Sequence, residues 1–256
     1  MILKLLQWNI AGGQRRNNND EPQIFDNYIV KDFQYFQDYI KKHNPDIVTF
    51  QESHTDKDKS NSLAKIASEN LGYYYCNHDH ADSHLNEKYR LSVSILSKYS
   101  LTDVNFTLFY NPMRRLTLSD GRVWITHDKG LLSGTIRVED KDIVLHTLHM
   151  VPFRKYEIEL NSDTAKRIFS DVEKSINIKS SYGIVAGDLN IDDKSLKAYF
   201  ENVFKSGYKE IELFEPTTPK GRHYDHILYK GLNVENFTID KTTLTDHYPL
   251  LVEFKL

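Results

Sequence analysis

Carboxylate, amide and imidazole side chains recur in this sequence where short apolar segments end or begin. Apolar segments of this kind are typical of buried strands. Because loops at strand ends are carried on a rigid sheet, residues far apart in the chain can meet there. Eight residues share this position and form the candidate site: Asn9, Glu52, His149, Asp188, Asn190, Asp225, Asp246 and His247.

This set has the composition of a site in which a hard cation assists reaction at a phosphate ester. Carboxylates with amide and imidazole neighbours, and no thiolate, suit Mg²⁺, which also takes water and phosphate oxygens as ligands. A phosphodiester is anionic and repels hydroxide, so a metal ion and an imidazolium would neutralise charge while a carboxylate activates water. A single Asp or Asn could instead cap a helix or close a turn, and only the joint recurrence indicates a site. The alternative of a serine nucleophile lacks support, because the sequence contains no Gly-x-Ser-x-Gly motif.

The elements that must position these residues are many short strands and a few helices. Apolar patterns predict strands at residues 3–8, 47–51, 73–77, 91–96, 102–110, 130–138, 143–149, 183–186, 224–229, 232–239 and 249–254. Helical spacing predicts helices at residues 30–43, 63–71, 165–176 and 196–207. This many strands exceed what one parallel sheet flanked by helices requires, and no linker-like stretch divides the chain. We therefore expect residues 1–256 to form a single α/β domain with two packed sheets and helices outside.

Composition limits the partners and the compartment. The 256 residues carry a formal net charge of -3, which argues against a protein that holds nucleic acid mainly through bulk positive charge. The single cysteine, Cys76, cannot form an intramolecular disulfide. No apolar run approaches the roughly 20 residues of a membrane helix. We expect a cytoplasmic protein with no membrane span, and no feature indicates an obligate protein partner.

Six short blocks contain the candidate residues and are distributed over the whole chain. They are Gln7-Trp8-Asn9-Ile10, Asp46-Ile47-Val48-Thr49-Phe50-Gln51-Glu52, Leu148-His149-Met150, Gly187-Asp188-Leu189-Asn190, Tyr224-Asp225-His226-Ile227 and Thr245-Asp246-His247-Tyr248-Pro249. In the content and order of these blocks the chain resembles the endonuclease/exonuclease/phosphatase superfamily. That superfamily includes pancreatic-type deoxyribonucleases, apurinic endonucleases, deadenylases, inositol polyphosphate 5-phosphatases and neutral sphingomyelinases. The resemblance implies a four-layer α/β sandwich, with two mixed β-sheets packed face to face and helices on the outside.

The resemblance also implies a phosphoesterase that depends on Mg²⁺, with Mn²⁺ as an alternative. Glu52 and Asp246 would be metal ligands, and Asn9 would help to bind metal and phosphate. Asp188 would orient or deprotonate the attacking water, with Asn190 beside it. The metal ion and the nucleophile would thus be handled by residues from separate blocks.

The histidines would handle the phosphate and the leaving group. His247 would contact the scissile phosphate while Asp225 fixes its tautomer, and His149 would stabilise the transition state or the leaving group. The block around His149 departs from the usual Thr-His-Leu, and His146 lies three residues earlier. Alternation along the strand puts His146 and His149 on opposite faces, so only one can point into the site. We expect that one to be His149, which lies nearer the strand end.

Substrate contacts are expected from the segments between the blocks. The acidic or tyrosine partner that some relatives supply from the middle of the chain has no clean counterpart here, and Glu87 and Tyr89 are the candidates. The cations Arg114, Arg154 and Arg222 could contact phosphates. Residues 12–22, 77–90, 111–129 and 216–223 are expected to form the cleft rim as loops, including the His- and Asp-rich stretch at 78–84, for which a transition-metal site is the weaker interpretation.

The sequence thus predicts a metal-dependent phosphodiesterase with nucleic acid as its preferred substrate. A phosphatase or phosphodiesterase acting on a small phosphorylated metabolite or a phospholipid is the alternative within the family. A binding module without turnover is the alternative of another class. The intact acidic residues argue against that module, because a metal site that is never occupied makes such a cluster electrostatically costly.

Overall fold

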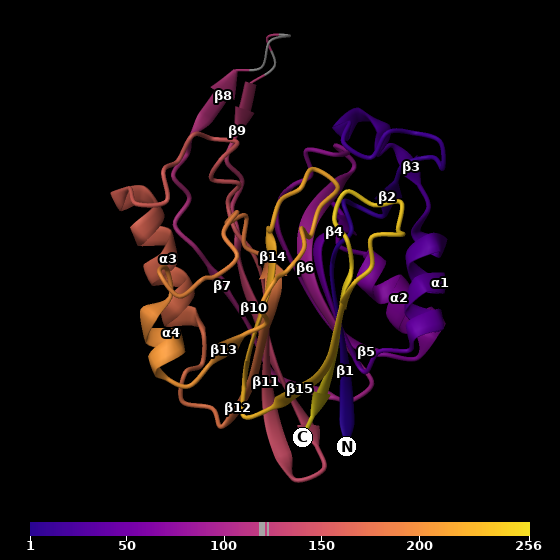
Figure 1. Ribbon diagram of the computed structural model, residues 1–256. Coiled ribbons are helices and arrows are strands. Elements are labelled where there is room, and N and C mark those ends of the chain that lie inside the picture. Colours follow the sequence, from indigo (N-terminus) through magenta and orange to yellow (C-terminus); the bar gives the residue numbers. More distant parts are fainter. Residues whose placement is uncertain (118–120, 122) are drawn as a thin grey trace.

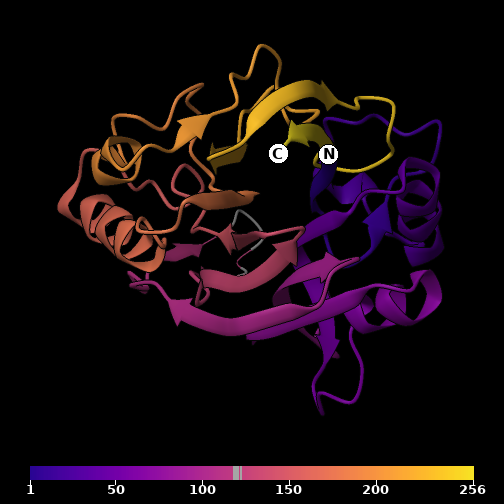
Figure 2. The same cartoon turned by 90° about the horizontal axis from the view of Figure 1, so that it is seen from below.

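Two large mixed β-sheets pack face to face in the computed structural model, which describes residues 1–117, 121 and 123–256 (Figures 1 and 2). The first sheet has the order β15 (Asn233–Ile239), β16 (Leu250–Lys255), β1 (Ile2–Asn9), β4 (Ile47–Asp56), β6 (Tyr89–Ser97) and β5 (Tyr74–Asp82). The second has the order β13 (Lys209–Glu210), β14 (Asp225–Lys230), β12 (Tyr182–Asp188), β11 (Lys141–His149), β10 (Gly130–Val138) and β7 (Leu101–Leu108). Both sheets combine parallel pairs, β1 with β4 and β11 with β12, with antiparallel ones.

Helices cover the outer face of each sheet and complete four layers (Figure 2). Helices α1 (Phe33–His43) and α2 (Leu63–Leu71) pack on the first sheet, and α3 (Asp163–Ser175) and α4 (Glu201–Lys205) pack on the second. The hydroxyl groups of Ser62 and Ser162 cap α2 and α3 by accepting backbone N–H bonds, which satisfies donors that the first turn leaves free. In the described part of the chain, no helix is long and apolar enough to span a membrane.

The layers follow from the alternation of side chains along each strand. In β1, Leu5 lies in the core between the sheets and Trp8 lies in the core under α1. In β12, Ile184 lies between the sheets and Val185 packs toward α3 and α4. Successive strand residues face opposite sides of a sheet, so a continuous apolar run fits a strand that is buried on both faces. The observed architecture confirms the predicted four-layer α/β sandwich.

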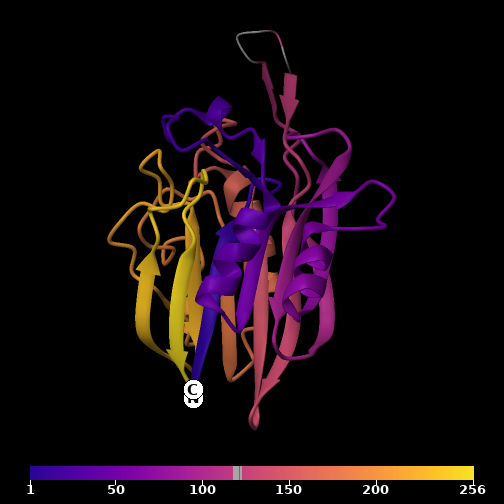
Figure 3. The same cartoon turned by 90° about the vertical axis from the view of Figure 1, so that its right-hand side faces the viewer.

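Small elements surround one end of the sandwich. Strands β2 (Gln14–Arg15) and β3 (Val30–Lys31) pair with each other, as do β8 (Arg115–Thr117) and β9 (Val123–Ile125), and a short 3₁₀ helix spans Phe25–Asn27. Figure 3 shows β8 and β9 extending beyond the sandwich at the end opposite the two chain ends. Strands β2, β8 and β9 fall in segments that were expected to form the rim, whereas β3 and the 3₁₀ helix lie outside those segments.

Several predicted boundaries differ from the observed ones, and three of these differences involve specific contacts. Residues 77–82 are strand rather than loop, because β5 continues along β6 as far as the pairing of Asp82 with Arg90. The helix predicted from residue 30 begins at Phe33, because residues 30–31 pair with β2. The helix predicted over 196–207 is confined to Glu201–Lys205. Before this helix begins, the backbone N–H of Leu196 donates to the carboxylate of Glu210.

Cys76 lies on the inner face of β5, in the core between the sheets. Burial raises the pKa of its thiol to about 12. Since the thiolate is the reactive form of cysteine, this residue is a packed core side chain without ready nucleophilic or redox chemistry at neutral pH.

His146 is buried on the outer face of β11, away from the inner face that carries His149. Its Nε2 accepts the backbone N–H of Asn177 at 3.2 Å, so its proton must be on Nδ1, which donates to Ser133 Oγ at 2.8 Å. Burial lowers the pKa of His146 to about 4. The ring is therefore neutral in the folded protein, as a structural link between β11, β10 and the segment after α3.

We predict that His146 makes the fold sensitive to acid. The unfolded chain takes up a proton at this residue near pH 6.5, whereas the folded protein does so only near pH 4, so stability falls as the pH drops through this window, by at most about 3 kcal/mol from this group. Urea unfolding at several pH values would show a smaller loss in His146→Gln than in the wild type. Equal losses in the two proteins would contradict the assignment.

Candidate active site

Alternate side chains of each strand point into the space between the sheets and form an inner row. Along these inner rows the space has three levels. The lowest level is apolar and contains Leu5, Ile47, Leu145 and Ala186. The next residues along the same inner rows are polar: Gln7, Thr49, Gln51 and Thr147. The rows end in Asn9, His149 and Asp188, which lie at the mouth of the inter-sheet space. Alternation therefore delivers chemistry-bearing residues of both sheets to one place.

A buried hydrogen-bond network at the polar level joins the two sheets. Gln51 Nε2 donates to Thr147 Oγ1 at 2.8 Å across the gap between the sheets, and to Gln7 Oε1 at 3.0 Å within the first sheet. Thr49 Oγ1 donates to Gln7 Oε1 at 2.6 Å, and Gln7 Nε2 lies 3.3 Å from Asp225 Oδ1. All five residues are at most 1% exposed. The network fixes the spacing of the sheets beneath the site and holds Asp225 from below.

A β-bulge aims Glu52 toward the site. Thr49 and Gln51 face inward, so strict alternation would turn Glu52 outward. The pairing of β4 with β6 shifts register between Phe50 and Ser53, and Glu52 has a φ of +51°, in the left-handed region. Bulges re-aim side chains, and a positive φ in a non-glycine residue persists only where the surroundings hold it. Here the Glu52 carbonyl accepts the backbone N–H of Gly12 at 2.8 Å.

Asp188 is the centre of the cluster. Its Oδ2 accepts Asn9 Nδ2 at 3.0 Å and lies 3.5 Å from His149 Nε2 and 3.8 Å from His247 Nε2. Its Oδ1 accepts the backbone N–H of Asn190 at 3.0 Å. Burial raises the pKa of Asp188 to about 7, with His247 acting in the opposite direction. The carboxylate is thus positioned by contacts from both sheets and titrates near neutral pH.

Gly187 permits the approach that places Asp188. A Cβ at this position would lie 2.1 Å from the carbonyl oxygen of Leu148 on the adjacent strand β11. No side chain can occupy that space without moving β11, which carries His149 one residue later. The glycine of the Gly-Asp-x-Asn block is therefore required by strand packing.

Asp225 and His247 form a buried ion pair. Asp225 Oδ2 accepts His247 Nδ1 at 2.7 Å, and Asp225 is fully buried at the start of β14. Burial alone would lower the pKa of His247, but Asp225 and then Asp188 raise it well above its usual value. The ring is therefore cationic, with Nδ1 engaged by Asp225 and Nε2 directed toward Asp188.

Lys129 contacts His149 and was not identified from the sequence. Its Nζ lies 2.9 Å from Nδ1 and 3.1 Å from Nε2 of that ring, so the ammonium lies over the ring face rather than in line with either nitrogen lone pair. Burial and then the Lys129 charge hold the pKa of His149 well below its usual value. The sequence gives only a lysine before the strand at 130–138, a pattern that many exposed residues share.

The donor set fits a divalent cation. Burial raises the pKa of Asp246 to about 6, and its Oδ1 is buried without a hydrogen-bond partner. Burial would also raise the pKa of Glu52, but His84, Lys129 and other cations lower it overall. No three His, Cys, Asp or Glu side chains among the described residues lie close enough to enclose a metal ion. Mg²⁺ keeps several waters and takes one or two carboxylates, so Glu52, Asp246 and the Asn9 amide suit it, whereas a closed transition-metal site is not formed.

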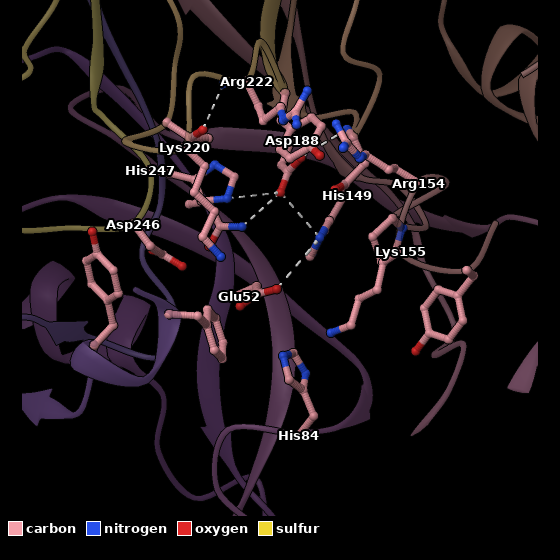
Figure 4. A pocket seen from close by; sticks show the side chains of 18 of the residues that line it. Glu52, His84, His149, Arg154, Lys155, Asp188, Lys220, Arg222, Asp246 and His247 are labelled. Carbon is pink, nitrogen blue, oxygen red and sulfur yellow. Dashed lines mark hydrogen bonds and ion pairs between the residues drawn. The ribbon is translucent and has the colours of Figure 1, made fainter. Parts of the chain in front are cut away.

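These residues line one cavity of about 680 Å³ (Figure 4). All the proposed metal ligands line it, as do His149, Asp188, Asn190 and His247, while Asp225 supports it from below. Of the four residues predicted to contact substrate, two line this cavity and two do not. Arg154 and Arg222 line the cavity; Arg114 does not, and Tyr89 stacks on His54 beside a separate cavity.

The loops predicted as rim contribute as expected, except for the part that forms β5. The lining includes residues from each of these segments: Pro22, His84, Leu116, Trp124, His127, Thr218, Lys220 and Arg222. Glu87 is exposed outside the cavity. The place expected for a mid-chain acid or tyrosine is therefore not filled by either candidate, whereas Lys129 comes from the middle of the chain and contacts His149.

Comparison with known proteins shows the family. The model of the endonuclease/exonuclease/phosphatase family matches residues 6–247, so the chain belongs to that family. Its members are phosphoesterases, among them nucleases and phosphatases, and they generally use a divalent metal ion. A UPF0294 protein of Vibrio vulnificus is 31% identical over 143 residues, covering 52% of this chain and 47% of that protein. The chain thus matches about half the length of this relative.

Solved structures share the fold. An endonuclease/exonuclease/phosphatase from Beutenbergia cavernae has a TM-score of 0.70 at 16% identity, covering 100% of this chain and 72% of that one. An AP endonuclease from Archaeoglobus fulgidus and a mannosyl-6-phosphatase from Bacteroides thetaiotaomicron have TM-scores of 0.62 and 0.65. Each is 16% identical and covers 99% of this chain and 100% of its own. The sandwich is therefore common to proteins named for different phosphoester substrates.

We predict that the polar network is essential for stability. Gln51→Leu would leave the Thr147 hydroxyl without its buried partner and would remove one of the partners of Gln7. It should lower the free energy of unfolding by about 3 kcal/mol, since each unsatisfied buried group costs about 1–3 kcal/mol. Chemical denaturation measures the loss. Gln34→Leu, at an exposed position of α1, is the matched control and should cost little. Similar losses for the two variants would contradict a special role for the network.

Proposed function

We propose that this phosphoesterase is a divalent-metal-dependent phosphodiesterase that cleaves nucleic acid by attack of water. The main support is the buried carboxylate of Asp188. Its Oδ2 lies 3.0 to 3.8 Å from the Asn9 amide and from the imidazoles of His149 and His247, which come from different strands and loops. Membership in a family of phosphoester hydrolases supports the reaction class. We further propose that residues 1–256 act as one domain, since both sheets contribute to a single site.

Asp188 is proposed to act as the base. With a pKa of about 7 it can accept a proton from water at neutral pH while its other oxygen is held by the Asn190 backbone N–H. The water oxygen attacks phosphorus, its proton passes to Asp188, and the bond from phosphorus to the leaving oxygen breaks. Asn9 fixes the orientation of the carboxylate through its Nδ2 bond.

The two histidines act in different protonation states. His247 is cationic through Asp225 and is proposed to contact a non-bridging phosphate oxygen through Nε2. His149 is neutral beneath Lys129 and is proposed to hydrogen-bond to the transition state or the leaving oxygen. The charge of Lys129 adds to the positive potential at the site. When bound by Asn9, Glu52 and Asp246, a divalent cation supplies further neutralisation of phosphate charge as a Lewis acid.

A phosphatase acting on a small phosphorylated metabolite is the second candidate. A cavity of about 680 Å³ is within the range that holds small ligands. The fold is also shared with a protein named as a mannosyl-6-phosphatase. Nucleic acid is preferred because the cavity combines exposed cations with the aromatic rings of Phe25, Trp124 and Tyr224, on which bases can stack.

We predict that Asp188→Asn and His247→Ala each reduce turnover at least about a hundredfold with folding largely kept, because each removes a group that is proposed to act on the reacting atoms. Steady-state hydrolysis of bis-p-nitrophenyl phosphate measures the loss. Asp142→Asn, exposed at the far end of β11, is the matched control and should retain activity. Turnover like that of the wild type in either site variant would refute the assigned role.

We predict that EDTA abolishes hydrolysis and that Mg²⁺ or Mn²⁺ restores it. The assay uses plasmid DNA, an abasic duplex, single-stranded RNA, phospholipids and sugar phosphates, so that it also tests the substrate class. Mg²⁺ should raise the thermal midpoint of the wild type and raise it less in a Glu52→Gln/Asp246→Asn variant. Activity that persists in excess chelator would remove the metal ion from the proposal, and cleavage of sugar phosphates alone would favour the second candidate.

A further inference from the structure

Lys155 and Lys220 are cavity cations that no described carboxylate neutralises. Both line the cavity, and neither forms an ion pair within the described part of the chain. The neighbouring arginines differ, because Arg222 pairs with Asp192 at 2.7 Å and Arg154 lies 4.0 Å from the same carboxylate. The two lysines therefore hold most of the uncompensated charge of the rim.

Each of these ammonium groups rests on an aromatic ring that also lines the cavity. Lys155 Nζ lies 3.2 Å from the centre of the Trp124 ring, and Lys220 Nζ lies 5.3 Å from the centre of the Phe25 ring. Such contacts orient an ammonium group but leave its full charge. Burial, then repulsion from Lys129 and Lys220, lowers the pKa of Lys155 to about 8, against the opposing effect of Glu52. Each lysine is thus held against a ring, and neither forms an ion pair with a described carboxylate.

The two lysines lie on opposite sides of the reacting centre. Figure 4 shows Lys155 on the side of His149 and Lys220 on the side of His247, with Asp188 between them. A phosphate that lies next to Asp188 for attack by water would therefore have one lysine on each side. A single phosphate monoester can engage the centre but offers no anion to both flanks.

We infer that Lys155 and Lys220 bind the phosphates that flank the scissile phosphate in a polynucleotide strand. The inference rests on the proposed function and names the feature of the substrate that the rim recognises. Each flanking phosphate replaces the ring as the partner of its lysine, which leaves Trp124 and Phe25 available to stack on bases. The two lysines therefore favour a phosphodiester chain over an isolated phosphate.

The test compares thymidine 3′,5′-bisphosphate with the thymidine 5′- and 3′-monophosphates as inhibitors of bis-p-nitrophenyl phosphate hydrolysis. The bisphosphate can place one phosphate at the centre and one on a flank, so in the wild type its inhibition constant should be lower by about tenfold, the equivalent of one charge-assisted contact. The ratio of the monophosphate to the bisphosphate inhibition constant should fall to about one in Lys155→Met/Lys220→Met, the loss of that tenfold preference. The single variants should each reduce this ratio. Lys41→Met, at an exposed position of α1, is the matched control and should keep the ratio.

The ratio separates this inference from general damage to the enzyme. A structural defect would weaken binding of all three nucleotides together, and Lys155→Arg/Lys220→Arg should restore much of the preference because it restores both charges. Equal inhibition by mono- and bisphosphate in the wild type, or an unchanged ratio in the double methionine variant, would overturn the inference. Calorimetric binding of the same nucleotides in Mg²⁺ gives the ratio without turnover, so inactivity toward the diester would count only against the proposed function.

Discussion

The hydrogen-bond network of Gln7, Thr49, Gln51 and Thr147 is the interaction on which the rest of the structure depends. Two sheets packed through apolar side chains alone would close over their whole length, and polar groups buried without partners would destabilise them. By satisfying one another, these four residues let polar side chains be buried between the sheets and join the two sheets below the site. The carboxylates and imidazoles of the site stand directly above them.

Two histidines of the same cavity have opposite protonation states, because each is buried next to a different charge. His247 faces the carboxylates of Asp225 and Asp188 and is protonated, whereas His149 lies under the ammonium of Lys129 and is neutral. The same two effects give the acids different pKa values. Burial raises the pKa of Asp188 and Asp246, whereas nearby cations lower the pKa of Glu52. One cavity can therefore present an acid, a base and a neutral donor at the same pH.

Much of this could be predicted from the sequence because strands impose a period of two. The inner row of β11 runs Ile143, Leu145, Thr147, His149, so the placement of His149 follows from alternation, as does that of His146 on the other face. Glu52 could be identified from its place at the end of an apolar segment, but its inward direction could not, because it depends on a bulge that breaks the alternation of side chains. Lys129 and the position of Tyr89 depend on tertiary contacts between distant segments, which no local pattern encodes.

The burial of Cys76 has a practical consequence for observing the cavity. The chain has this one cysteine, and its thiol lies between the sheets with a pKa of about 12. Alkylating probes attack thiolates that solvent can reach, so the wild-type protein should give a low background in labelling with a fluorophore or spin label. A cysteine introduced on β8 or β9 would then be labelled selectively, and its signal would report the binding of a substrate at the rim.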